Sequence, residues 1–348
     1  MSKFDGQLDA PLAPVQPSPT ALELDLLRNS LLTPPIPNSN QTTYPPGTEP
    51  SLQQTYHWLA RLARQLQQDK TKEFLIENMQ PSWLETSTQM WLYQIAIGLI
   101  TGLIVALIYV GTTGLIGATI GGLSYAVILG FTKEIYPITS LKFSLDFAKK
   151  QLFASLLEGL WWGLIYGIID AFVCWLLWGF KWLFLGMADS LVWGLIEGLI
   201  WGLLVPGFSH PTVSNQGMRE SAINAGIFTV IGGVAWGLLY AGVLLASGEP
   251  LEPLDLLIDS IGNGVFFGIY VGGLACLQHV ILRWILKQNG AIPCNYAQFL
   301  DYATELGFLE REGGRYRFIN DSVQEHFAQM PLNNPKPNVN KRFWLFAP

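Results

Sequence analysis

The chain has 348 residues, of which 50% are apolar and only 13% are charged, with a formal net charge of −6. An ordinary soluble domain carries about a quarter charged residues, so the composition excludes a typical soluble protein. The acidic balance, without a Lys/Arg-rich helix or a basic aromatic groove, excludes nucleic acid as a partner. Most of the charge lies in residues 1–90 and 283–348, which leaves a long apolar middle.

The first segment, residues 1–50, is predicted to be a disordered, Pro-rich tail. Ten of the 21 prolines of the chain lie in it. Proline fixes φ and removes a backbone donor, so such a segment forms neither a regular helix nor a sheet. No apolar stretch of a cleaved signal peptide follows Met1, and we expect the first membrane span to direct insertion.

Residues 51–90 are predicted to form a cytoplasmic, amphipathic helical arm. Apolar side chains recur at three- and four-residue spacing from Leu52 to Leu66, with Gln and Arg on the other face, which indicates a helix. A second helix is expected over 72–79. Trp83 and Trp91 follow it, where an interfacial aromatic belt precedes a membrane span.

Residues 91–284 are predicted to form a transmembrane helical bundle with six spans. A spanning helix needs about 20 apolar residues, and the first apolar run is long enough for two. The expected spans are two helices within Tyr93–Phe131, separated at Gly111–Gly114, and then Leu152–Trp178, Trp182–Val205, Ala222–Ala246 and Leu256–Leu282.

The orientation of the bundle follows from the basic residues of its short loops. The loop after the second span carries four lysines, including Lys149 and Lys150, and Arg283 and Lys287 follow the sixth span. The charged residues of the loop after the fifth span are all acidic. Because basic loops stay in the cytoplasm, six spans place both termini there.

Glycines recur at every fourth position along the predicted spans, which puts them on one stripe of each helix. Small residues at this spacing let membrane helices approach closely. The segments 156–164 and 195–203 also match position by position, which indicates an internal repeat. Such repeats occur in transporters and channels as well as in plain anchors. The predicted packing glycines are Gly159, Gly163, Gly167, Gly194, Gly198, Gly202, Gly233, Gly237, Gly264 and Gly268, besides Gly98 and Gly102.

Four polar residues within the predicted spans are candidate functional groups: Glu158, Glu197, Asp170 and Asn263. An ionisable side chain costs a few kcal/mol in a bilayer and usually faces the bundle interior or water. The alternative is structural, namely interhelical hydrogen bonds and neutralisation by nearby lysines. Neither the three isolated cysteines nor the four dispersed histidines form a ligand or catalytic set, so we predict no enzyme, cofactor or metal.

Residues 285–331 are predicted to form a small cytoplasmic module, followed by a flexible tail over 332–348. A helical spacing over Tyr296–Leu306 precedes two strand-like segments around Gly313-Gly314, and Asn320 or Asp321 can cap a final helix. This order of elements, a helix followed by a strand hairpin and a second helix, resembles that of a winged helix. The whole chain is thus predicted to be an all-α polytopic membrane protein, with about six Gly-rich packed spans and a small α+β module.

Segments on either side of the spans resemble the C-terminal membrane region of NACHT-type (STAND) NTPases common in cyanobacteria. They are Phe74–Leu84, Asn289–Tyr296, Phe299–Glu305 and Gly313–Asn320, although Asn320 stands where that family often has His. The resemblance implies the membrane-anchored C-terminal half of such an architecture. The chain has no G-x-x-x-x-G-K-[ST] phosphate-binding loop, so we expect no ATP hydrolysis.

Two functions follow from these observations. The leading hypothesis is a membrane anchor or signalling module, with the arm and the C-terminal module as docking surfaces for a NACHT-type NTPase or another cytoplasmic protein. The rival hypothesis is a small channel or transporter lined by Glu158 and Glu197. The sequence leaves self-association into a homo-oligomer open.

Overall fold

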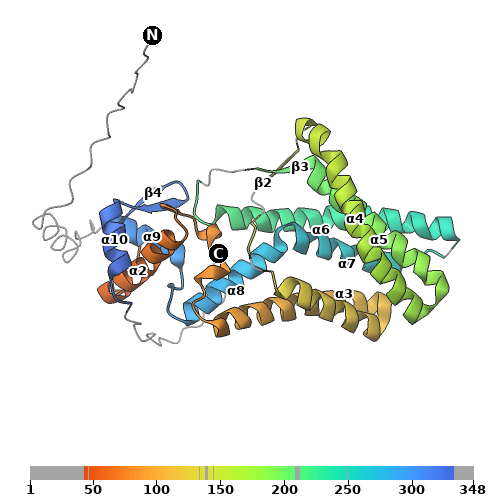
Figure 1. The fold of residues 1–348 in the computed structure, drawn as a ribbon, viewed down its shortest axis with the longest axis horizontal. Coiled ribbons are helices and arrows are strands. Elements are labelled where there is room, and N and C mark those ends of the chain that lie inside the picture. Colours follow the sequence, from red (N-terminus) through yellow and green to blue (C-terminus); the bar gives the residue numbers. More distant parts are fainter. Residues whose placement is uncertain are drawn as a thin grey trace, which may run out of the picture.

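The computed structural model describes residues 43–332, apart from 46, 133, 138–139, 144, 208–211 and 249. Most of the predicted Pro-rich tail, residues 1–42, and nearly all of the predicted C-terminal tail lie outside the described residues. The described part consists mainly of long helices, with a small mixed helix and sheet region at one end (Figure 1).

The predicted arm contains one helix and three shorter elements. Helix α2 begins with a capping box, in which the Ser51 side chain accepts from the Gln54 backbone and the Gln54 side chain accepts from the Ser51 backbone. The helix predicted over 72–79 is wrong, because a strand and a 3₁₀ turn occupy this segment. The elements are α2 (Leu52–Gln68), β1 (Glu73–Phe74), η1 (Ile76–Asn78) and η2 (Pro81–Trp83).

The C-terminal region follows the predicted order of helix, hairpin and helix. Asn320 caps the last helix, since its Oδ1 accepts from the backbone N–H of Val323 at 2.7 Å. Strand β1 of the arm adds to the hairpin, so the antiparallel sheet has the order β1-β5-β4 with Phe74 opposite Tyr316. The elements are α9 (Tyr296–Glu305), β4 (Leu309–Glu312), β5 (Arg315–Phe318) and α10 (Asp321–Gln329).

The arm and the C-terminal region share one hydrophobic core, and we call residues 51–84 and 289–330 together the composite module. Phe74 lies between Trp83 and Tyr296, at centroid distances of 5.4 and 5.5 Å. The two predicted domains therefore fold as one unit, with partners more than 200 residues apart. Core side chains come from α2, β1, α9, the hairpin and α10, among them Leu59, Leu62, Ala63, Phe74, Tyr296, Phe299, Tyr316 and Phe327.

The first long segment, α3 (Ser87–Gly130), is a helical hairpin, as the sequence predicts. Gly114 breaks it with a φ of 68°, in the left-handed region that favours glycine. The two halves pack with almost no space between their backbones. A Cβ added to Gly98 would lie 2.6 Å from the carbonyl oxygen of Ala126, and one on Gly102 equally close to that of Gly122.

The second hairpin is formed by α4 (Leu145–Trp178) and α5 (Phe180–Leu203), which reverse at Gly179. A Cβ on Gly163 would lie 2.7 Å from the carbonyl oxygen of Ser190, and Gly159 lies directly against the backbone of Gly194. Strand β2 (Ser140–Phe143) pairs antiparallel with β3 (Leu204–Gly207), which joins the two ends of this hairpin (Figure 1).

The third hairpin packs α6 (Gln216–Ser247) against α7 (Pro253–Gly268), where a Cβ on Gly233 would lie 2.7 Å from the Ser260 carbonyl oxygen. Helix α7 continues through a π-helical turn, η3 (Ile269–Gly273), into α8 (Leu274–Gln288). Gly272 has a φ of 126° and lies on the Ser221 carbonyl. This turn bends the helix and lets α8 run into the composite module (Figure 1).

The ten glycines predicted to mediate packing all face the paired helix of their own hairpin. A Cβ on any of them would have an atom of that helix within 3.3 Å. Because real Cβ atoms essentially never come closer than 3.0 Å to other heavy atoms, most of these positions hold no larger residue without a backbone shift.

Aromatic side chains join the three hairpins at the centre of the bundle. Trp193 of α5 stacks on Phe267 of α7, with the ring centroids 3.9 Å apart, and contacts Phe266 edge-on at a centroid distance of 4.8 Å. Tyr125 of the first hairpin contacts Phe266 at 4.9 Å, and Trp236 of α6 lies 6.0 Å from Trp193. Aromatic contacts therefore join the hairpins to one another, together with a close contact between Gly262 of α7 and Ile108 of α3.

Three helices in the described part of the chain are long and apolar enough to cross a membrane: Ser87–Val110, Gln216–Gly242 and Pro253–Gln288. Two shorter apolar helices are Gly114–Gly130 and Ser190–Ile200. The composition and length of these helices fit association with a membrane.

The glycine contacts predict that Gly159→Ala destabilises the second hairpin by about 1–3 kcal/mol, because the added methyl overpacks the contact with Gly194. Gly242→Ala is the matched control, since a Cβ there meets nothing within 4 Å. That change should be neutral or stabilising by up to about 1 kcal/mol through helix propensity. Thermal unfolding in detergent measures both, and equal effects would contradict the packing role.

Candidate functional site

A cavity of about 270 Å³ lies between the second hairpin and η3, and it brings together the two glutamates that the sequence singles out. Glu158 comes from α4 and Glu197 from α5. The residues that line it are Ser155, Glu158, Gly159, Trp162, Glu197, Gly198 and Tyr270.

The glycine contacts explain why Glu158 and Glu197 line the same cavity. Helices α4 and α5 run antiparallel, with Gly159 against Gly194 and Gly198 against Ser155. Each glutamate directly precedes one of these glycines. The repeated Glu-Gly pair therefore lies at the same level on both helices, and its two carboxyl groups reach one cavity.

Tyr270 completes the cavity from the third hairpin, and its hydroxyl donates a hydrogen bond to Oε1 of Glu197. It lies in the π-helical turn, whose extra residue changes the direction in which its side chain leaves the helix. Sequence reasoning missed Tyr270. The available signal was the neighbouring Gly272-Gly273 pair, which marks a helix irregularity.

The other two candidates lie elsewhere. Asn263 serves a helix contact, in which its Oδ1 accepts from Nε1 of Trp193 at 3.3 Å and its Nδ2 donates to the Asp259 carbonyl at 3.0 Å. This is the structural alternative that the sequence left open. Asp170 belongs to α4, but its side chain lies outside the described residues.

A second group of buried polar side chains joins the composite module to the bundle. The Glu77 side chain is 4% exposed, and backbone N–H groups of Gly217 and Asn215, at the start of α6, donate to it. Its Oε2 has no hydrogen-bond partner among the described residues. Burial raises the pKa of Glu77 above its ordinary value, and the nearby charge of Glu220 adds to this.

Three side chains tie the bundle to η1 and to the segment after the first hairpin. Nε2 of the buried His279 in α8 lies 2.8 Å from the Ile76 carbonyl oxygen. Gln80 makes two hydrogen bonds with the backbone of Ile135, at 2.8 and 2.9 Å. Gln278 donates to the Thr132 hydroxyl at 2.7 Å.

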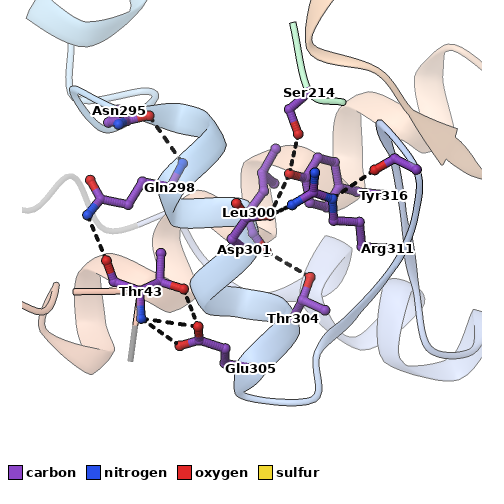
Figure 2. A network of polar contacts seen from close by, with 11 residues as sticks. Thr43, Ser214, Asn295, Gln298, Leu300, Asp301, Thr304, Glu305, Arg311 and Tyr316 are labelled. Atoms are coloured by element: carbon purple, nitrogen blue, oxygen red, sulfur yellow. Dashed lines mark hydrogen bonds and ion pairs between the residues drawn. The ribbon is translucent and has the colours of Figure 1, made fainter. Parts of the chain in front are cut away.

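The loop before α6 also contacts the hairpin of the composite module (Figure 2). Burial raises the pKa of Tyr316 to about 12, so its hydroxyl stays protonated and donates to Oδ1 of Asp301 at 2.7 Å. The Ser214 hydroxyl, 2.6 Å away, then donates to Tyr316. Arg311 pairs with the same carboxylate oxygen at 2.7 Å.

The end of the predicted tail lies on α9. The Thr43 backbone N–H donates to the Glu305 carboxylate at 3.1 Å, and Gln298 donates to the Thr43 carbonyl at 3.0 Å (Figure 2). Tyr44 meets Tyr302 edge-on at 5.3 Å. The chain is therefore held at this point, seven residues before the predicted tail ends.

Among the described residues, no group of three or more His, Cys, Asp or Glu side chains could hold a metal ion. Cys276 and Cys294 are free thiols, and the side chain of Cys174 lies outside the described part. Comparisons with protein-family models, with curated proteins and with solved structures found no match to this chain. The resemblance to NACHT-type NTPases remains a prediction.

The buried Glu77 predicts a pH dependence of stability. A carboxyl with a raised pKa in the folded state contributes most below its ordinary pKa of 4.5, and this contribution is lost as the pH rises through the raised value. Glu77→Gln should therefore flatten the stability profile above pH 4.5 and be at least as stable as wild type near neutrality. Thermal unfolding over a pH series measures this.

The exposed Glu325 provides the control, because Glu325→Gln should keep the wild-type profile. Parallel profiles for wild type and Glu77→Gln would contradict the role assigned to this carboxyl.

Proposed function

We propose that this chain is a multi-pass membrane protein that anchors the composite module at the cytoplasmic face and couples it to the bundle. The observation that carries this proposal is a hydrophobic core that continues from the module into two apolar helices. Tyr93 and Ile97 of α3 and Leu282 and Ile285 of α8 belong to the same core as Phe299. A displacement of the module therefore acts directly on the first and last membrane helices.

Six crossings are the number that best fits this arrangement. Three helical hairpins supply six helices, and a module assembled from both ends of the chain requires an even number of crossings. Large apolar side chains also face outward on the first helix, where Leu99, Leu103 and Leu107 are 60–66% exposed. Lipid covers such side chains at no cost.

The six-span topology predicts opposite labelling of the two ends of the third hairpin. A cysteine placed at Glu252, between α6 and α7, should react from the outside, whereas cysteines at Lys72 and Glu325 should react only from the cytoplasmic side. The reagent is a membrane-impermeant maleimide, and the background is a variant without Cys174, Cys276 and Cys294. Labelling of all three sites from the same side would contradict this topology.

The proposed partner class is a NACHT-type NTPase or another cytoplasmic protein that docks on the composite module. Support comes from the location of the resembling segments. Phe74–Leu84 supplies one residue of β1 and both 3₁₀ turns, and Gly313–Asn320 supplies the hairpin turn and β5. The two segments meet in one sheet, where Phe74 pairs with Tyr316. The chain contributes no phosphate-binding loop of its own, and the partner would supply ATP hydrolysis.

A channel or transporter is the second candidate, and the cavity between Glu158, Glu197 and Tyr270 favours it. Carboxylates within apolar helices commonly mark an ion or proton path, and here Glu158 is exposed and Glu197 is partly buried. The hydrogen bond from Tyr270 to Glu197 would link such a path to α8 and hence to the module. Away from the cavity, the tight glycine contacts between α4 and α5 leave little room for water to pass between these helices, which is why we rank the anchor first.

Flux measurements separate the two candidates. If the protein is an anchor, purified wild type in vesicles should conduct no more than empty vesicles, and Glu158→Gln and Glu197→Gln should insert and conduct in the same way. Glu252→Gln, an exposed residue outside the cavity, is the control. A wild-type flux that drops about tenfold or more in Glu197→Gln but not in Glu252→Gln would reverse the ranking.

A further inference from the structure

A second cavity, of about 170 Å³, lies where α2 and η2 meet the end of α8 and the start of α9. It differs from the first cavity in charge, because two guanidinium groups line it. The residues that matter for its chemistry are Arg61, Arg64, Ser82, Trp83, Glu85 and Tyr296.

The cavity carries an excess of positive charge. Arg61 pairs with Glu85 at 2.7 Å, but the Glu85 side chain is 55% exposed whereas that of Arg61 is 16% exposed. Among the described residues, the acceptors for Arg64 are main-chain carbonyls, those of Ala328 at 2.8 Å and of Met330. Carbonyls leave its charge uncompensated, and no carboxylate of the described residues lies within ion-pair distance of Arg64.

Trp83 forms a rigid, buried wall of the cavity. The residue is 8% exposed. Its ring stacks on that of Phe74, with the ring centroids 5.4 Å apart. Because its indole nitrogen has almost no exposed surface, Trp83 contributes shape to the cavity and the arginines contribute the charge.

The cavity also lies at the depth of lipid headgroups, if the module sits on the membrane as proposed above. Trp83 precedes the first apolar helix, which begins at Ser87, and Leu286 lines the cavity near the end of the last one. Trp91 and Trp284, on these two helices, are 55% and 52% exposed. Exposed tryptophans at helix ends mark the membrane interface.

We propose that this cavity binds the phosphate group of an anionic phospholipid. Arg61 and Arg64 supply charge-assisted donors, which suit phosphate oxygens, and the Ser82 hydroxyl supplies a neutral one. Basic pockets beside membrane helices bind anionic headgroups in this way. The bound lipid would fasten α2 and η2 to the end of α8. The inference rests on the proposed membrane location.

The test is native mass spectrometry of the purified full chain after exchange into detergent with equal phosphatidylglycerol and phosphatidylcholine. Wild type should retain phosphatidylglycerol preferentially. Arg61→Gln should lower this retention about tenfold, the effect of one charge-assisted hydrogen bond. Ser82→Ala, which removes the hydroxyl that lines the cavity, should lower it about threefold for a neutral donor. Lys72→Gln should leave it unchanged.

Lys72 is the matched control, because it is a cation of the same module, is 74% exposed and pairs with Asp321 at 2.7 Å outside the cavity. Equal retention by wild type and both cavity variants overturns the proposal. An equal loss in Lys72→Gln also overturns it, because the attraction would then be diffuse. Thermal unfolding identifies a variant that fails to fold, and the other cavity variant then decides.

Two further arms separate the source of the phosphate and the proposed membrane location. If inorganic phosphate raises the unfolding temperature as much as phosphatidylglycerol does, the lipid assignment is wrong. Wild type should resist extraction from membranes by alkaline carbonate. Resistance without preference for phosphatidylglycerol overturns this site alone, whereas extraction overturns the proposed function itself.

Discussion

Close contact between glycine-lined helix backbones is the constraint on which this bundle depends. Within each hairpin, glycines at four-residue spacing place the carbonyl groups of one helix where a larger residue's Cβ would stand on the other. In lipid, where burying another leucine gains nothing, such close packing is a main source of association energy. The hairpin is thus the unit of construction, and aromatic residues such as Trp193 fill the wider spaces between units.

The same constraint sets the position of the polar groups. Because the contacts fix the register of α4 against α5, Glu158 and Glu197 lie at one level and share a cavity. The π-helical turn has a related consequence, since the close approach of Gly272 to Ser221 bends the last helix and Tyr270 reaches Glu197. The hydrogen bond between Tyr270 and Glu197 therefore links the second and third hairpins.

The composite module supplies the second constraint, because it closes the chain on itself. The arm continues into the first apolar helix, α3, and the last apolar helix, α8, continues into α9. The distance between α3 and α8 at this end is therefore set by the core that they share with the module. Glu77, His279 and Tyr316 reinforce this link with buried polar contacts. The lipid headgroup that we propose for Arg61 and Arg64 would bind at the same junction.

The sequence by itself determined the features that rest on local periodicity. It predicted helix α2, the helical hairpin over 93–131, the glycine stripes and the helix, hairpin and helix order of the C-terminal region. Each rests on a local signal, either a periodicity of a few residues or the turn and capping residues such as Gly313-Gly314 and Asn320. Only the tertiary structure decided that residues 73–74 form a strand rather than a helix, because the partner that satisfies their backbone lies at Tyr316 and Arg317. It alone placed Tyr270 beside Glu197 and joined the arm to the C-terminal region, since contacts between residues so distant in the chain leave no local pattern.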